Sequence, residues 1–355
     1  MYSKGHGGNI YDEAINYDFS VNTNPLGMPE DVKEKLKENL GDICEVYPEE
    51  TCYELRKSIS LKENISEHQI ICGNGASELI YGLVRAIRPQ KALVVVPSFS
   101  EYIRALRAED TQMVYYHLAP ERDFIVAEDI MSYLTPDIDM VFLCNPNNPT
   151  SSQIDRQSMR IILDTCKEKG IFVMVDETYV EFSEKADEIT SIPLTNYYNN
   201  IIILRGISKF FAAPGLRLGY AICGNHQLLQ DIDSKKNPWT INSLAAVAGE
   251  IMFQDKEYIH DTKELISSER RRICSILDKC PNIKYYPPHG NFILVRILRD
   301  DVTSMDLFEA AIRKGLMIRD CSTFPFLDNK YIRFCFMNPA DNDALLDVLF
   351  EQLNK

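Results

Sequence analysis

The sequence predicts an α/β fold in which a mostly parallel sheet is covered by helices, joined to a smaller α+β unit. From about residue 64 to residue 224, short apolar runs rich in β-branched residues alternate with longer stretches of helical periodicity. This alternation is typical of parallel strands linked by crossover helices. The predicted strands are residues 92–96, 140–144, 171–175, 201–204 and 218–222. The predicted helices are residues 77–87, 100–108 and 155–169.

After Pro238 the pattern changes. A long helical stretch covers about residues 243–278, and a strand at 331–336 stands between helices at 304–314 and 341–353. We therefore expect a large α/β domain over residues 31–240. Residues 1–30 are too few to fold alone, so we expect them to join residues 241–355 in a smaller α+β domain.

Composition restricts the possible partners and the compartment. The 355 residues carry a net charge of −14, which repels nucleic acid and anionic lipid, so an anionic substrate needs local arginines. Ten cysteines without a Cys-x-x-Cys pair indicate free thiols in a reducing compartment, with no disulfide frame and no metal site. No apolar core of a signal peptide and no membrane-length apolar stretch is present, so we expect a cytoplasmic protein.

Two charged residues stand at the ends of predicted strands. Lys209 lies among apolar neighbours in the loop after strand 201–204, and Asp176 directly follows strand 171–175. Desolvation lowers the pKa of a lysine and makes it a usable amine nucleophile. Ligands of open α/β sheets bind at the carboxyl ends of the strands, where Asp176 stands. Each residue alone also fits a structural role, as a surface lysine near a turn or as a helix cap.

Two more turns follow strands in the same way. The loop Cys144-Asn-Pro-Asn-Asn-Pro-Thr150 has a backbone fixed by prolines, from which Asn148 can donate a hydrogen bond. The turn Gly73-Asn-Gly75-Ala76-Ser77 opens a helix whose first N–H groups form an anion site, which Arg217 would complete. Plain turns use the same residue types. The ordered set of such turns after successive strands nevertheless predicts one shared ligand site.

This set of residues resembles the fold-type I aminotransferase superfamily of pyridoxal 5′-phosphate (PLP) enzymes over essentially the whole chain. The resemblance implies that Lys209 holds PLP as a Schiff base, that Asp176 pairs with the pyridine nitrogen, and that Asn148 and Tyr179 contact the phenolate oxygen. It also implies that Phe99 stacks on the ring. The implied phosphate ligands are Gly75, Ala76, Ser77, Ser208 and Arg217.

The superfamily also implies a homodimer, in which Tyr47 of each subunit reaches the cofactor phosphate of the other. Two positions depart from its usual pattern. Gly206 stands where Ser or Thr often supplies another phosphate ligand, and Ser151 ends a turn that usually ends in glycine. Neither change removes a catalytic group.

Three stretches resemble the L-threonine-O-3-phosphate decarboxylases of cobamide biosynthesis: His6-Gly-Gly-Asn9, residues 18–27 (Asp18 to Gly27, including Asn22) and residues 237–249 (Asn237-Pro-Trp239 to Gly249). Histidinol-phosphate aminotransferases share the cofactor residues but commonly lack the His-Gly-Gly-Asn start and the Pro-Trp segment. The resemblance implies decarboxylation of L-threonine O-3-phosphate to (R)-1-aminopropan-2-yl phosphate, with a substrate pocket lined by His6, Asn22, Arg319 and Arg333.

Other functions stay open. A histidinol-phosphate-type aminotransferase is one, since the sequence does not show which bond at the substrate Cα is aligned for cleavage. A decarboxylase that prefers L-serine O-phosphate is another, because the two substrates differ by one methyl group, worth ~1 kcal/mol of apolar burial. A protein that binds PLP or an amino-acid phosphate without turnover is the alternative from a different class. The sequence also leaves open which of Arg319 and Arg333 binds the substrate phosphate and which binds the carboxylate.

Overall fold

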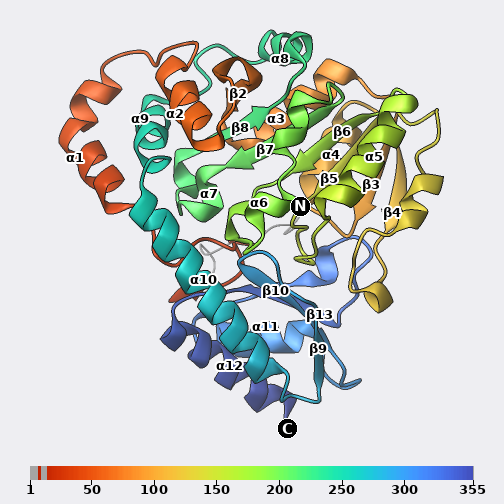
Figure 1. The fold of residues 1–355 in the computed structure, drawn as a ribbon. Coiled ribbons are helices and arrows are strands. Elements are labelled where there is room, and N and C mark those ends of the chain that lie inside the picture. The colour runs from red at the N-terminus through yellow and green to blue at the C-terminus, as the bar shows by residue number, and fades with distance from the viewer. Residues whose placement is uncertain (1–6, 9–13, 355) are drawn as a thin grey trace.

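The computed structural model describes residues 7–8 and 14–354. A seven-stranded sheet and a four-stranded sheet lie one above the other in Figure 1. A further pairing joins β1 (Tyr17–Asp18) to β11 (Leu316–Met317), so the N-terminal segment lies against the C-terminal part of the chain. None of the helices in the described ranges is long and apolar enough to cross a membrane.

The seven-stranded sheet has the order β2-β8-β7-β6-β5-β3-β4. Four of its neighbouring pairs are parallel, which confirms the predicted α/β class. Its strands are β2 (Ile70–Gly73), β3 (Lys91–Val96), β4 (Gln112–His117), β5 (Met140–Cys144), β6 (Phe172–Asp176), β7 (Ile201–Gly206) and β8 (Gly219–Ile222).

Strand β8 corrects the expectation of a parallel strand at residues 218–222. It runs antiparallel to both β7 and β2. The chain between β7 and β8 forms only the one-turn helix α7 (Ile207–Phe210) and a 3-10 turn at Pro214–Leu216, so it returns beside β7 instead of crossing the sheet. The edge strands β2 and β4 were not among the predicted strands.

Helices cover both faces of this sheet because successive side chains of each strand point to opposite sides. In β5, Val141 and Leu143 join one apolar cluster, while Met140 and Phe142 join the other. The first cluster packs against α2 (Tyr53–Glu63), α5 (Arg156–Glu168) and α9 (Ser243–Met252). The second packs against α3 (Gly75–Ile87), α4 (Ser100–Ala108) and α8 (His226–Asp233). The shorter helix α6 (Ala186–Ile189) follows β6, and α1 (Glu30–Cys44) contacts α9.

The C-terminal part forms an antiparallel sheet of order β12-β13-β10-β9. Its strands are β9 (Ile283–Tyr285), β10 (Phe292–Ile297), β12 (Arg319–Asp320) and β13 (Tyr331–Cys335). Helix α11 (Ser304–Ile312) contacts β12 and packs against α12 (Pro339–Leu353), and both helices lie in the lower part of Figure 1. The helical stretch predicted at 243–278 is two helices, because the side chain of Asp255 accepts the N–H of Tyr258 and begins α10 (Lys256–Leu277).

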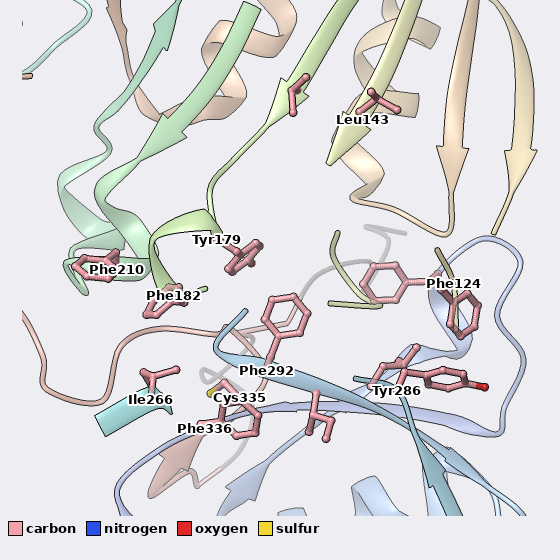
Figure 2. Packing of buried hydrophobic residues seen from close by; sticks show 14 of the residues in the cluster. Phe124, Leu143, Tyr179, Phe182, Phe210, Ile266, Tyr286, Phe292, Cys335 and Phe336 are labelled. Atoms are coloured by element: carbon pink, nitrogen blue, oxygen red, sulfur yellow. The ribbon is translucent and has the colours of Figure 1, made fainter. Parts of the chain in front are cut away.

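The core is continuous between the two sheets. Figure 2 shows Tyr179, which follows β6, facing Phe292 of β10 across the junction, with their ring centroids 4.8 Å apart. Phe124 and Tyr286 form a second such contact at 4.7 Å. Groups carried by one sheet are thereby held close to groups carried by the other.

Candidate active site

A pocket opens between the two sheets, at the carboxyl ends of β5, β6 and β7. It encloses about 1110 Å³ of empty space, including its open mouth, which is ample for a cofactor and a small substrate. The sequence-predicted residues that line it are Gly75, Ala76, Ser77, Phe99, Asn148, Asp176, Tyr179, Ser208, Lys209, Arg217, Arg319 and Arg333.

Lys209 projects into the pocket from α7, one turn after β7. Its Nζ donates to the carbonyl oxygen of Val21 at 2.6 Å. Burial and the nearby positive charge of Arg333 lower the pKa of the Lys209 amine to about 8. An amine with this pKa is partly neutral near physiological pH and can act as a nucleophile or a base.

Asp176 ends β6 and is 4% exposed. Its Oδ2 accepts the hydroxyl of Tyr102 at 2.7 Å, while its Oδ1 accepts the N–H and hydroxyl of Thr178 at 2.9 and 2.5 Å. Sequence reasoning missed both partners. The ring of Tyr102 is clamped between Phe99 and Phe142, and burial raises the pKa of its hydroxyl, so Tyr102 stays a donor. The carboxylate is therefore fixed in one orientation beside the pocket.

Tyr179 and Asn148 form a pair of potential donors on the same side. Burial raises the pKa of Tyr179 to about 12, so its hydroxyl stays protonated. Asn22 donates its amide to this hydroxyl at 3.3 Å. The side-chain oxygen of Asn148 accepts from Arg333, which leaves the Asn148 amide N–H groups as donors.

The start of α3 and Arg217 form an anion-binding corner. Gly75 has a φ of +75°, and a side-chain carbon built on it would collide with the Arg217 guanidinium. Gly219 of β8 lies so close to Ala76 that it too has no room for a side chain. Backbone N–H groups, the Ser77 hydroxyl and a guanidinium therefore converge at a helix N-terminus, an arrangement suited to a phosphate.

Two buried arginines face the pocket from the small sheet. Arg319 of β12 and Arg333 of β13 are directly opposite each other in the antiparallel register. They are 8% and 4% exposed. Arg319 donates to the Thr323 hydroxyl at 2.7 Å, and Arg333 donates to Asn148 and to the backbone of Ser20. Burial and the positive charge of Arg333 lower the pKa of Arg319, so two like charges are held together at the pocket.

Among the described residues, two predicted site residues, Asn22 and Tyr47, are not in the pocket's lining. Asn22 is fully buried. Its side-chain amide donates to the hydroxyl of the lining residue Tyr179, and its backbone carbonyl accepts the Asn291 amide. Tyr47 is 81% exposed and packs on Trp239, with centroids 5.0 Å apart. His6 lies outside the described residues.

The two departures from the superfamily pattern have clear local settings. Gly206 is extended, with φ −166°, and its nearest neighbour for an added side chain is the Leu218 carbonyl at 3.4 Å. Ser151 has a φ of +61°, and its hydroxyl accepts the N–H groups of His289 and Gly290 at 3.0 and 2.8 Å. The Ser151 hydroxyl thus adds two hydrogen bonds to the one that the His289 N–H makes with the Ser151 carbonyl at 3.1 Å, and a glycine would keep only the backbone bond.

The pocket fits PLP by the chemistry of its groups. It holds an amine able to react with an aldehyde, an oriented carboxylate for the pyridine nitrogen, two donors for the ring oxygen, and a phosphate corner. Arg319 and Arg333 line the same pocket, where Arg333 also orients the Asn148 side chain. These arginines can bind a second molecule that carries negative charge.

Comparison with known proteins agrees with this geometry. The family model "Aminotransferase class I and II" matches residues 15–349. A threonine-phosphate decarboxylase from Salmonella typhimurium is 34% identical, over 98% of this chain and 96% of that protein. A histidinol-phosphate aminotransferase from Methanothermobacter thermautotrophicus is 30% identical, over 96% of this chain and 89% of that protein.

Solved structures show the same likeness. The crystal structure of the histidinol-phosphate aminotransferase from Clostridium acetobutylicum superimposes with a TM-score of 0.88 at 31% identity, covering 95% of this chain and 99% of that chain. Family, fold and pocket chemistry thus agree. The chain belongs to the class I and II aminotransferase family and is a PLP-dependent enzyme of fold type I.

Proposed function

We propose that this enzyme decarboxylates L-threonine O-3-phosphate to (R)-1-aminopropan-2-yl phosphate for cobamide biosynthesis. The observation that carries the proposal is the pair Arg319 and Arg333, buried opposite each other in the pocket that also contains Lys209. Two adjacent buried guanidiniums suit a small substrate with two anionic groups, a phosphate and a carboxylate.

The cofactor would be held by other groups of the pocket. Arg217 and the start of α3 would bind its phosphate, and Asp176 would pair with its pyridine nitrogen. Tyr179 and Asn148 would donate to its ring oxygen. Bound PLP supplies an electron sink that stabilises negative charge at the substrate Cα. The fixed orientation of Asp176 supports that function, because its charge cannot turn away from the ring.

Lys209 would supply the proton that the substrate Cα receives. Because its pKa is lowered to about 8, the amine can be protonated or neutral during one catalytic cycle. In the proposed reaction the Cα–carboxylate bond breaks, CO2 leaves, and a proton from Lys209 or water takes its place at Cα. The residues that anchor the two anionic groups decide which bond at Cα is aligned for cleavage.

Sequence similarity supports the lyase over its nearest alternative. The Salmonella threonine-phosphate decarboxylase is 34% identical, and a second relative described as a putative threonine-phosphate decarboxylase, from Caldanaerobacter subterraneus, is 35% identical. The histidinol-phosphate aminotransferase of the same Caldanaerobacter species is 30% identical. The alternative function is transamination of histidinol phosphate, because the structure of one such aminotransferase superimposes on this chain with a TM-score of 0.88.

We also propose that the enzyme works as a homodimer in which Tyr47 of each subunit reaches the other's cofactor phosphate. The exposure of Tyr47, at 81%, together with its position on Trp239, supports this role because both rings would be covered by a second subunit. Light scattering of the purified protein tests it, and a monomer at micromolar concentration would contradict it.

The test of the reaction is to incubate PLP-loaded protein with L-threonine O-3-phosphate without a keto acid and to follow CO2. Steady CO2 release supports the lyase. L-serine O-phosphate, run in parallel, measures the preference between the two phosphorylated amino acids. Conversion of the cofactor to its pyridoxamine form without CO2, or turnover of L-histidinol phosphate with 2-oxoglutarate, would contradict the lyase in favour of the transaminase.

Matched variants connect the reaction to the arginine pair. Arg319→Gln and Arg333→Gln should each raise KM at least tenfold, because each removes a charged hydrogen bond worth about 1.5–3 kcal/mol. Arg296→Gln is the control, since Arg296 belongs to the same sheet but lies over the Tyr331 ring, outside the pocket. Equal effects at all three positions would contradict the assignment of the pair.

A further inference from the structure

The segment after β12, residues 321–328, connects the arginine pair to the edge of the large sheet. Its base is anchored in the core, since Cys321 is 0% exposed and Phe324 and Leu327 are each 9% exposed. The N–H of Phe324 donates to the Cys321 carbonyl at 2.9 Å, and that of Leu327 to the Phe324 carbonyl at 3.2 Å. The segment is therefore a compact turn with a fixed base.

The tip of this turn is Phe326, an apolar residue that is 53% exposed. Its φ is +70°, a conformation that costs an L-residue about 1–2 kcal/mol and that a bulky side chain rarely adopts. Strained backbone of this kind persists only where surrounding contacts hold it, and it often marks a functional position.

The contacts that hold Phe326 come from the other sheet. Its ring meets the His117 ring edge-on, with centroids 4.3 Å apart, and lies 5.4 Å from the Tyr115 ring. Tyr115 and His117 are two residues apart on β4, so their side chains share one face of that edge strand. The tip thus bridges from the arginine-bearing sheet to the sheet that carries the predicted cofactor ligands.

The residues between base and tip line the pocket. Thr323, Phe324 and Pro325 all face it. Thr323 accepts the hydrogen bond of Arg319, and the Phe324 ring lies 5.2 Å from the Arg319 guanidinium and 5.9 Å from that of Arg333. Any shift of this turn would therefore move a hydrogen-bond partner of Arg319 and the aromatic ring that lies beside both guanidiniums.

We propose that Phe326 is a positioning residue for substrate binding: its docking on Tyr115 and His117 holds the 321–328 turn against β4 and so fixes Arg319 and Arg333 for an anionic substrate. The identity of that substrate rests on the proposed function, whereas the docking itself does not. The side chain acts through the turn and does not reach the reacting atoms.

The experiment compares Phe326→Ala, Phe326→Gly and Phe326→Tyr in the PLP-loaded enzyme. Alanine removes the ring and keeps the backbone strain, glycine removes both, and tyrosine keeps the ring. Leu298→Ala is the control, because Leu298 is 50% exposed and lies outside the pocket lining. Three quantities are measured: kcat and KM for L-threonine O-3-phosphate, the affinity for inorganic phosphate, and hydrogen exchange of the Phe324 and Leu327 amides.

We expect the alanine and glycine variants to raise KM and to weaken phosphate binding by roughly two- to tenfold, the range for loss of an aromatic pair, with kcat within about twofold. Exchange at Phe324 and Leu327 should become faster in both. The cofactor absorbance should not change, and the tyrosine variant should behave like the unchanged enzyme. His117→Ala should reproduce the effect and should not add to Phe326→Ala.

Unchanged exchange or unchanged affinity in the alanine variant would overturn the proposal. Full recovery in the glycine variant would also overturn it, because backbone strain and not the ring would then be responsible. Phosphate binding and hydrogen exchange do not depend on turnover. An enzyme without decarboxylase activity would therefore refute the proposed function while leaving the docking role of Phe326 to be judged on its own.

Discussion

Replacing Gly75 with alanine should weaken cofactor binding through one identifiable collision. The new methyl group would overlap the end of the Arg217 side chain, which is flexible and exposed and can swing away without unfolding the protein. Arg217 would then lose the charged hydrogen bond that we propose it makes to the cofactor phosphate, worth about 1.5–3 kcal/mol. The dissociation constant for PLP should rise by about tenfold to a little over a hundredfold.

A second glycine separates this collision from backbone strain. Gly75 and Gly170 have φ values of +75° and +72°, so alanine at either costs a similar ~1–2 kcal/mol of stability, but nothing lies within 4 Å of a side-chain carbon at Gly170. Both variants should therefore lose similar thermal stability without cofactor. Titrating PLP into each cofactor-free variant and following its visible absorbance gives the affinities. Wild-type affinity in Gly75→Ala, or equal weakening in Gly170→Ala, would refute the reasoning.

Three further predictions concern the pocket. Capture of PLP by the cofactor-free protein needs the neutral Lys209 amine, so its rate should rise with pH through about 8. Arg333→Gln should move the midpoint of this pH profile upward by removing a positive charge near Lys209. Stopped-flow absorbance measures both profiles, and an unmoved midpoint would contradict the effect of Arg333 on the Lys209 pKa. Tyr102→Phe should lower kcat by about tenfold or more through loss of one charged hydrogen bond to Asp176, with packing against Phe142 preserved; full activity in CO2-release assays would show that the hydroxyl is dispensable. In urea unfolding, the natural protein should be the most stable, Ser151→Gly less stable and Ser151→Ala the least stable. Both variants lose the two side-chain hydrogen bonds, but only glycine relieves the strain of the φ of +61°. A glycine variant more stable than the natural protein would reverse the interpretation.

Local patterns were sufficient for the elements nearest the cofactor. Strand β5 and helix α4 have the predicted bounds, and Asp176 ends β6 as expected. These elements have strong apolar periodicity and sharp polar ends. Edge strands β2 and β4 were missed because β2 is four residues long and β4 carries polar residues at both ends, so neither has the long apolar run of a central strand.

The direction of β8 was predicted wrongly for a related reason. Apolar runs show where a strand lies but not which way it points, and the direction depends on the length and path of the connection before it. The partners of Asp176 illustrate the same limit on a smaller scale. Tyr102 is 74 residues away along the chain, and only the parallel pairing of β3 with β5 and of β5 with β6 brings its hydroxyl to the carboxylate.

The sequence by itself therefore determined the α/β class, the family, the cofactor and the residue types that serve it, because each depends on short motifs at the ends of strands. The tertiary structure decided how the groups meet. It set Arg319 opposite Arg333, placed the Asn22 amide against the Tyr179 hydroxyl, and packed Phe326 on β4. These contacts join segments far apart in the chain, and their geometry follows from packing the small sheet against the large one, which no local pattern encodes.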